Sequence, residues 1–149
     1  MIDYAAIEAE IRLELAGCSG ANDAMALLVA ILKRRLPDYT WVGIYQLQGN
    51  ELVLGPYLGK PSPHTRIPLG RGICGAAATT RQTIVVDDVN ADERYLACSL
   101  ETQSEIVVPV TRNGEVLAEI DVDSDRRAAF GRQDRELLEA AASILAEKL

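Results

Sequence analysis

Two cysteines of this sequence stand where a thiol could do chemistry. Cys74 falls at the start of a short Ala-rich segment, where the N-terminus of a helix would stabilise a thiolate, and Arg66 and Arg71 are near it in the sequence. Free cysteines are among the most buried residue types, so on sequence alone we favour a packing role for Cys74. Cys98 lies in an expected loop between charged segments and is the better nucleophile candidate. We assign no role to Cys18, which is expected at a helix end.

Three acidic residues are predicted to meet at one end of a hairpin. Glu105 opens an apolar strand, and Asp121 and Asp123 alternate at the end of the next one, so both point to the same face. A turn at Asn113-Gly114 would return that strand end to the side of Glu105. Carboxylates this close raise one another's pKa, which would leave one protonated and able to act as an acid near neutrality. The alternative is a solvated strand end.

Trp41 and Tyr45 stand four residues apart on an expected strand and therefore share a face. They are either core residues or an aromatic wall for a methyl, thioether or cationic group.

Two other motifs lack the context that their chemistry needs. Residues 70–75 fit G-x-G-x-x-G, but a proline-rich loop precedes them and only about two helical turns follow, so a dinucleotide site is not expected. His64, Cys74 and Cys98 are spaced by ten and twenty-four positions, which matches no compact structural zinc pattern. We expect neither a metal nor another cofactor.

Apolar periodicity and turn residues predict the elements that must position these groups. Two helices are expected first, one from Asp3 to Gly17 and one capped by Asn22 and ended before Pro37. A hairpin of strands 41–48 and 51–57 follows, then a proline-rich ordered loop over 58–69, a short helix over 73–80 and a lone strand over 83–86. A second hairpin of strands 104–111 and 115–121 and a last helix over 131–149 complete the chain.

This order predicts an α+β fold, with an antiparallel sheet, terminal helices packed on one face, and loops and short helices forming a pocket on the other. With 149 residues we expect a single domain over residues 1–149, and we look for function in segments 58–80 and 87–105.

The formal net charge of −7 disfavours nucleic acid as a partner. No apolar run is long enough to cross a membrane and the acidic start does not resemble a targeting peptide, so we expect a cytoplasmic protein.

Taken together, these residues resemble a GAF domain and, more narrowly, the free methionine-(R)-sulfoxide reductases. The similarity runs from Trp41 to Ser124 in the family's order and spacing, and it is carried by the segments 41–45, 54–57, 59–61, 70–75, 88–89, 97–98, 104–109 and 121–124.

The resemblance implies reduction of free methionine (R)-sulfoxide to methionine, with thioredoxin or another thiol reductant as electron donor. It implies that Cys98 is the attacking thiolate and that Trp41 and Tyr45 enclose the S-methyl group. The acidic residues would hold the substrate amine and protonate the departing oxygen; they are Glu105, Asp121 and Asp123. Attack on the sulfoxide would leave a sulfenic acid that a second thiol condenses into a disulfide.

One position departs from the family pattern. Relatives commonly have a resolving cysteine ten positions before the one that matches Cys74, and this chain has His64 there. Cys74 would then form a disulfide with Cys98, or an external thiol would attack the Cys98 sulfenic acid. The alternative is a non-catalytic GAF module that senses a small ligand or a redox signal. A homodimer formed through the terminal helices is compatible with either.

Overall fold

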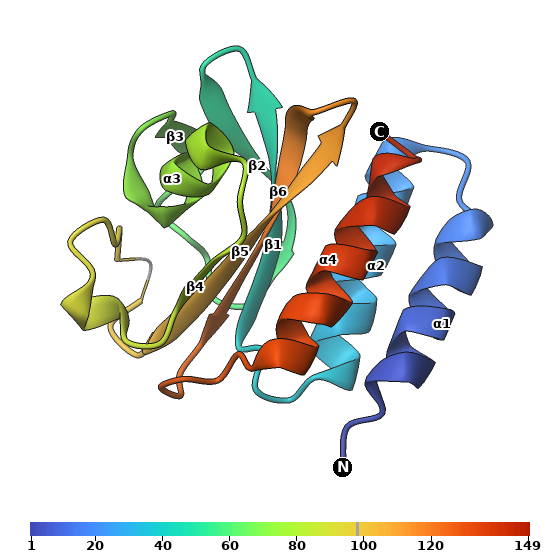
Figure 1. Cartoon of the computed structure of the whole chain (residues 1–149), viewed down its shortest axis with the longest axis horizontal. Coiled ribbons are helices and arrows are strands. Elements are labelled where there is room, and N and C mark those ends of the chain that lie inside the picture. Colours follow the sequence, from blue (N-terminus) through green and yellow to red (C-terminus); the bar gives the residue numbers. More distant parts are fainter. Residues whose placement is uncertain (98) are drawn as a thin grey trace.

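The computed structural model describes residues 1–97 and 99–149, which form helices on both sides of a six-stranded antiparallel sheet in the strand order β3-β2-β1-β6-β5-β4 (Figure 1). The expected α+β fold is confirmed. The elements are α1 (Tyr4–Ala16), α2 (Ala21–Arg35), β1 (Trp41–Gln48), β2 (Glu51–Leu58), β3 (Arg66–Pro68), α3 (Gly72–Thr80), β4 (Ile84–Val86), the 3-10 helix η1 (Val89–Ala91), β5 (Ser104–Arg112), β6 (Glu115–Ser124) and α4 (Arg132–Ala146).

Both expected hairpins form: β1 pairs with β2 and β5 pairs with β6. Three local expectations are corrected. Gly20, not Asn22, caps α2, because the helix already begins at Ala21. The proline-rich stretch 58–69 includes β3, which a proline can enter because the strand lies at the sheet edge. Strand β6 continues past Asp121 to Ser124, so Asp123 is also a strand residue.

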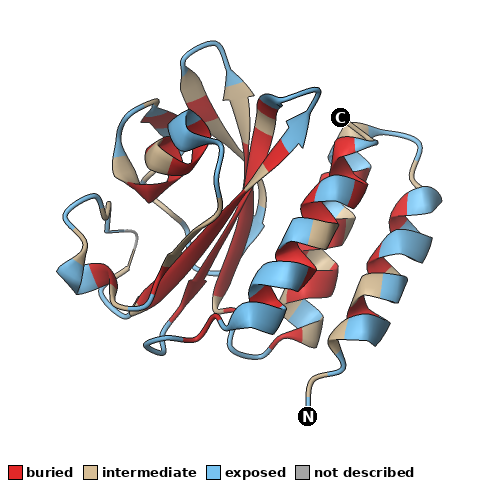
Figure 2. Cartoon of the chain, viewed as in Figure 1, coloured by how far each residue is buried: buried red, intermediate tan, exposed pale blue. Residues whose placement is uncertain are grey.

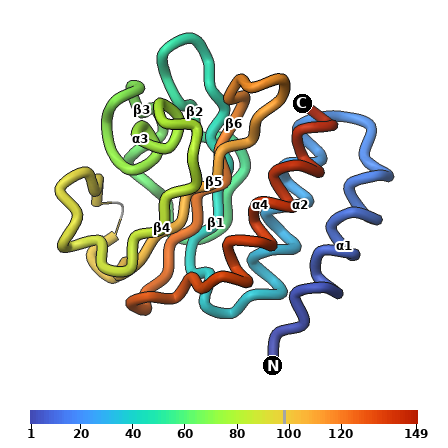
Figure 3. Tube along the Cα trace, in the orientation of Figure 1, coloured from blue at the N-terminus to red at the C-terminus, as the bar shows by residue number. Residues whose placement is uncertain are grey.

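The core on one side of the sheet is apolar. Helices α2 and α4 pack there, and α1 packs mainly against these two helices (Figure 1). Every second residue along β5 and β6 points into this core, while the outer faces of the helices stay exposed (Figure 2). Ile106, Val108, Ile120 and Val122 are among them. The C-terminus lies beside the α1–α2 connection (Figure 3), where the Lys148 ammonium donates to the carbonyl of Cys18.

The opposite side carries a smaller cluster beneath α3 and the β2–β3 loop. Trp41, Tyr45, Cys74 and Val107 belong to it. Period 2 therefore sends neighbouring residues of β5 and β6 into two different environments, one apolar and one that contains polar groups. Among the described residues, none of the helices has the length and apolar character needed to cross a membrane.

Asp134 fixes the start of α4. One of its oxygens accepts hydrogen bonds from the hydroxyls of Tyr39 (2.9 Å) and Tyr4 (3.2 Å), and the other accepts from the backbone N–H of Gly131 (2.9 Å). The carboxylate is itself buried, so these bonds join α1, the approach to β1 and α4.

We expect Asp134→Ala to lower the free energy of unfolding by about 2–3 kcal/mol, because it removes charge-assisted bonds and leaves the Tyr39 hydroxyl buried without an acceptor. Asp3→Ala is the matched control, since it removes an exposed N-cap worth about 1 kcal/mol. Urea unfolding of both variants measures the difference. Equal losses would contradict the anchoring role of Asp134.

Candidate active site

Four carboxyl groups gather on the inner face of β5 and β6. Glu105 and Asp123 are direct cross-strand partners, and Asp121 and Glu119 precede Asp123 at intervals of two residues. All four are buried, with Glu119 at 0% exposure. The predicted convergence of Glu105, Asp121 and Asp123 is therefore present.

Glu119 was missed in the sequence analysis. Its signal was available, because Glu119, Asp121 and Asp123 continue one period-2 series along β6. Apolar residues on both sides make this part of the strand resemble an ordinary half-buried strand with its acidic side in water. In the structure, neither carboxyl oxygen of Glu119 has a hydrogen-bond partner among the residues described.

Burial raises the pKa of three of these acids. For Asp123 and Glu119 the pKa lies well above its ordinary value, first because burial penalises the charged form and then because Asp121 adds like charge. Burial also raises the pKa of Asp121, although hydrogen bonds with Glu105 and Cys74 oppose the rise. The cluster consequently retains protons under conditions in which exposed carboxyls would have lost them.

Cys74 joins this cluster from the first turn of α3. Its thiol donates to Oδ2 of Asp121 at 3.5 Å. The favoured prediction of a buried Cys74 is confirmed, and the alternative of a thiolate at the helix N-terminus is not supported, because burial and the charges of Asp121 and Glu105 raise the thiol's pKa well above its ordinary value. Arg66 does not offset this, since its guanidinium pairs with Glu51 of β2 and both side chains are exposed. Cys74 is thus a buried, protonated and free thiol.

Trp41 and Tyr45 form an aromatic wall on the same face of β1, with ring centroids 6.5 Å apart. The Trp41 indole N–H donates to the Lys60 carbonyl (3.0 Å), and the Tyr45 hydroxyl donates to the His64 carbonyl (2.7 Å). Both bonds fix the β2–β3 loop over the sheet. Gly43 makes room for the wall, because a Cβ at that position would collide with the six-membered ring of Trp41.

Cys98 lies outside the described residues, but its sequence neighbours contact the β2–β3 loop. A ring nitrogen of His64 lies 3.0 Å from the carbonyl oxygen of Ala97, with the donor role set by the tautomer. The Lys60 ammonium pairs with Glu101 at 3.2 Å. His64, at the position of the missing cysteine, therefore connects the loop to the residue that precedes Cys98.

Two small hollows reach the cluster. One, of about 80 Å³, lies between Trp41, Lys60 and Asp123, and the other, of about 10 Å³, lies between Tyr45, Cys74 and Glu105. None of the described residues that line the second hollow is a lysine or an arginine. Thiol, protonatable carboxyls and aromatic rings therefore border these hollows, and this set of groups suits proton-assisted thiol chemistry.

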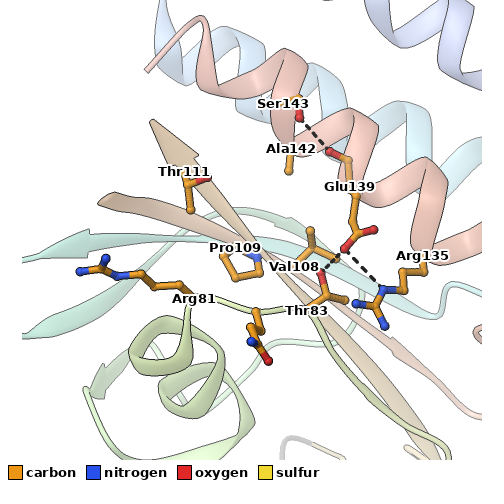
Figure 4. A pocket seen from close by; sticks show the side chains of 10 residues that line it. Arg81, Thr83, Val108, Pro109, Thr111, Arg135, Glu139, Ala142 and Ser143 are labelled. Carbon is orange, nitrogen blue, oxygen red and sulfur yellow. Dashed lines mark hydrogen bonds and ion pairs between the residues drawn. The ribbon is translucent and has the colours of Figure 1, made fainter. Parts of the chain in front are cut away.

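A larger cavity of about 540 Å³ lies between α4 and the outer part of β5 (Figure 4). Its carboxylate, Glu139, already accepts from Thr83 and Arg135. The described residues that line it include no thiol and no aromatic ring. The smaller hollows, not this cavity, hold the residues singled out from the sequence.

Replacing Glu119 tests the electrostatic cost of the cluster. The folded-state pKa of Glu119 lies above the ordinary value of 4.5, so the chain takes up a proton when it folds at a pH between the two values. The free energy of unfolding of the wild type therefore falls as pH rises above 4.5. We expect Glu119→Gln to exceed the wild type in unfolding free energy by about 1–3 kcal/mol at pH 8, with the gain shrinking toward pH 4.5. Urea unfolding across this range measures it. Exposed Glu115→Gln is the control, and a pH-independent difference for Glu119→Gln would refute the explanation.

The chain is similar to a known protein family, to characterised sequences and to solved structures. The family described as GAF domain matches residues 20–149. Free methionine-R-sulfoxide reductase of Escherichia coli (strain K12) is 36% identical over 129 residues, which cover 87% of this chain and 76% of that protein. The Saccharomyces cerevisiae protein of the same name is 39% identical over 128 residues, covering 83% and 71%. An X-ray structure of free methionine-R-sulfoxide reductase from Neisseria meningitidis in complex with its substrate matches with a TM-score of 0.93 and 36% identity, covering 97% of this chain and 87% of that one.

Proposed function

Because the chain belongs to the GAF-domain family and, within it, to the free methionine-R-sulfoxide reductases, we propose that it reduces free L-methionine (R)-S-oxide to methionine with electrons from thiols. The observation that carries the proposal is the Cys74 thiol hydrogen-bonded to Asp121 inside a cluster of buried carboxyls. Such a cluster supplies both a proton donor for a sulfoxide oxygen and a second thiol for the oxidised enzyme.

Substrate recognition uses the two sides of the pocket. A free amino acid brings an ammonium group, which pairs with the buried Glu105 and Asp123 carboxyls and favours loss of the Asp123 proton on binding. Trp41 and Tyr45 border the hollows with apolar ring surface, which suits the S-methyl group.

In the first step, the Cys98 thiolate attacks the sulfoxide sulfur and a protonated carboxyl of the cluster donates its proton to the sulfoxide oxygen. The S–O bond breaks as oxygen passes to Cys98, so sulfoxide sulfur gains two electrons, methionine leaves and Cys98 becomes a sulfenic acid. The raised pKa of Asp121 keeps such a proton available.

In the second step, Cys74 resolves the sulfenic acid. Its proton passes to Asp121, whose Oδ2 already accepts the thiol hydrogen bond, and the resulting thiolate attacks Cys98 sulfur. Hydroxide leaves and takes a proton to become water, so a Cys74–Cys98 disulfide forms. With His64 in place of the family's further cysteine, Cys74 is the resolving thiol. Thioredoxin or another dithiol of the reducing cytoplasm then restores both thiols.

Cys74→Ser separates the two steps. We expect the variant to release about one methionine per chain without added reductant and to lose one thiol, while the wild type loses two. Turnover with thioredoxin should fall about tenfold or more, because the sulfenic acid must await an external thiol. Methionine release and thiol titration measure both quantities. Cys18→Ser, at the far end of α1, is the matched control. Undiminished turnover by Cys74→Ser would exclude Cys74 as the resolving thiol.

Asp121→Asn removes the carboxyl next to Cys74 without changing its size. We expect kcat/KM at pH 7 to fall about 10²- to 10⁴-fold, the range for loss of a general acid or base. Since the raised pKa of Asp121 keeps its proton toward neutral pH, acid catalysis by the wild type weakens as pH rises through that pKa, and this dependence should disappear in the variant. Kinetics from pH 6 to 9 test it, with exposed Asp87→Asn as control. An unchanged pH profile would assign the proton to another group.

A further inference from the structure

The cluster that holds the catalytic proton also holds a set of metal-ligating atoms. Cys74 Sγ, one carboxylate oxygen of Glu105 and one of Asp121 all lie within 4.8 Å of one another. They come from α3, β5 and β6, so no local sequence motif joins them. In a tetrahedral site with metal–ligand distances of about 2.0–2.3 Å, neighbouring donors are about 3.5 Å apart. A contraction of about 1 Å would enclose an ion.

Buried oxygen atoms without partners point to a ligand at this place. Oδ1 of Asp121 is buried and has no hydrogen-bond partner within the described part of the chain, while its Oδ2 receives the Cys74 thiol. Glu119 lies two residues earlier on the same strand face and is fully buried. Neither of its carboxyl oxygens has a hydrogen-bond partner among the described residues. Buried carboxylates need protons, a positive group or a metal ion as partners, and no lysine or arginine is among the residues that line this hollow.

The chemistry of the donors selects the ion. Calcium and magnesium prefer oxygen ligands alone, whereas a thiolate with two carboxylates suits Zn²⁺. The His64 ring nitrogen already lies at the Ala97 carbonyl, so the donor set at hand is one sulfur and two oxygens. Three protein ligands leave a fourth position for water on the side of the hollow, as in open zinc sites.

We propose that Cys74, Glu105 and Asp121 form a binding site for a thiophilic divalent cation, Zn²⁺, and that its occupancy inhibits sulfoxide reduction. Binding replaces the thiol proton, together with any proton held by the Glu105 and Asp121 carboxyls, with the metal ion and releases H⁺ to water, with no change in oxidation state. The bound ion removes the resolving thiol and the carboxyls that would otherwise act on substrate. The inhibition, though not the binding, rests on the proposed function.

Cobalt titration tests the site independently of catalysis. The reduced, chelator-treated full chain is titrated with Co²⁺, for which a thiolate ligand gives a sulfur-to-cobalt charge-transfer band in the near ultraviolet. We expect one Co²⁺ per chain and displacement of the band by Zn²⁺. The band should vanish in Cys74→Ser, and Co²⁺ affinity should fall about tenfold or more in Glu105→Gln. It should persist in Cys18→Ser. Far-ultraviolet circular dichroism verifies that each variant is folded.

A band that survives in Cys74→Ser, that requires Cys18 or Cys98, or that never forms in the wild type would overturn the proposed site. In the activity arm, Zn²⁺ should slow methionine formation and a chelator should restore it. A chain that binds Co²⁺ through Cys74 but releases no methionine would support the metal site and refute the proposed function. A chain that reduces the sulfoxide but gives no Cys74-dependent band would do the reverse.

Discussion

Four acidic side chains on one face of two neighbouring strands impose the main constraint on this molecule. All four are buried: Glu105, Glu119, Asp121 and Asp123. Among the described residues that line the hollow between Tyr45, Cys74 and Glu105, there is no lysine or arginine. Together they cannot all be charged at neutral pH without a large energetic cost, so protons or a cationic ligand must accompany them. In the proposed function, the ammonium group of the substrate supplies that cation and the sulfoxide oxygen takes up one of the protons.

The rest of the fold makes this constraint tolerable. Alternation along β5 and β6 sends Ile106, Val108, Ile120 and Val122 to the opposite face, where α2 and α4 cover them. Burial of these apolar side chains stabilises the fold and offsets the free-energy cost of burying the carboxyl groups on the acidic face. On the acidic face, α3 brings the Cys74 thiol to Asp121, and two aromatic residues hold the β2–β3 loop through its carbonyls. One face of the sheet therefore forms the apolar core and the other carries the candidate site, because successive residues of a strand point to opposite faces.

Much of this arrangement could be predicted from the sequence. The turn at Asn113-Gly114 and period-2 alternation were sufficient to bring Glu105 next to Asp123, since hairpin register is a local property. The charge state of Cys74 could not be predicted, because its burial and its contact with Asp121 depend on how α3 packs on the sheet. Glu119 was overlooked although it continues the period-2 series of Asp121 and Asp123, because the apolar residues around it resemble those of a half-buried strand whose acidic side faces water. Strand β3 was missed because its pairing with β2 depends on tertiary context.

The central claim is that this pocket reduces free methionine (R)-sulfoxide with its own thiols. The most direct test is a single-turnover reaction of the fully reduced chain, without added reductant, with the R and S epimers of free methionine sulfoxide supplied separately. Methionine release and free thiols are counted before and after. The proposed mechanism predicts about one methionine per chain from the R epimer, loss of two thiols, and little product from the S epimer. No methionine from either epimer would contradict it and would favour a pocket that only binds its ligand.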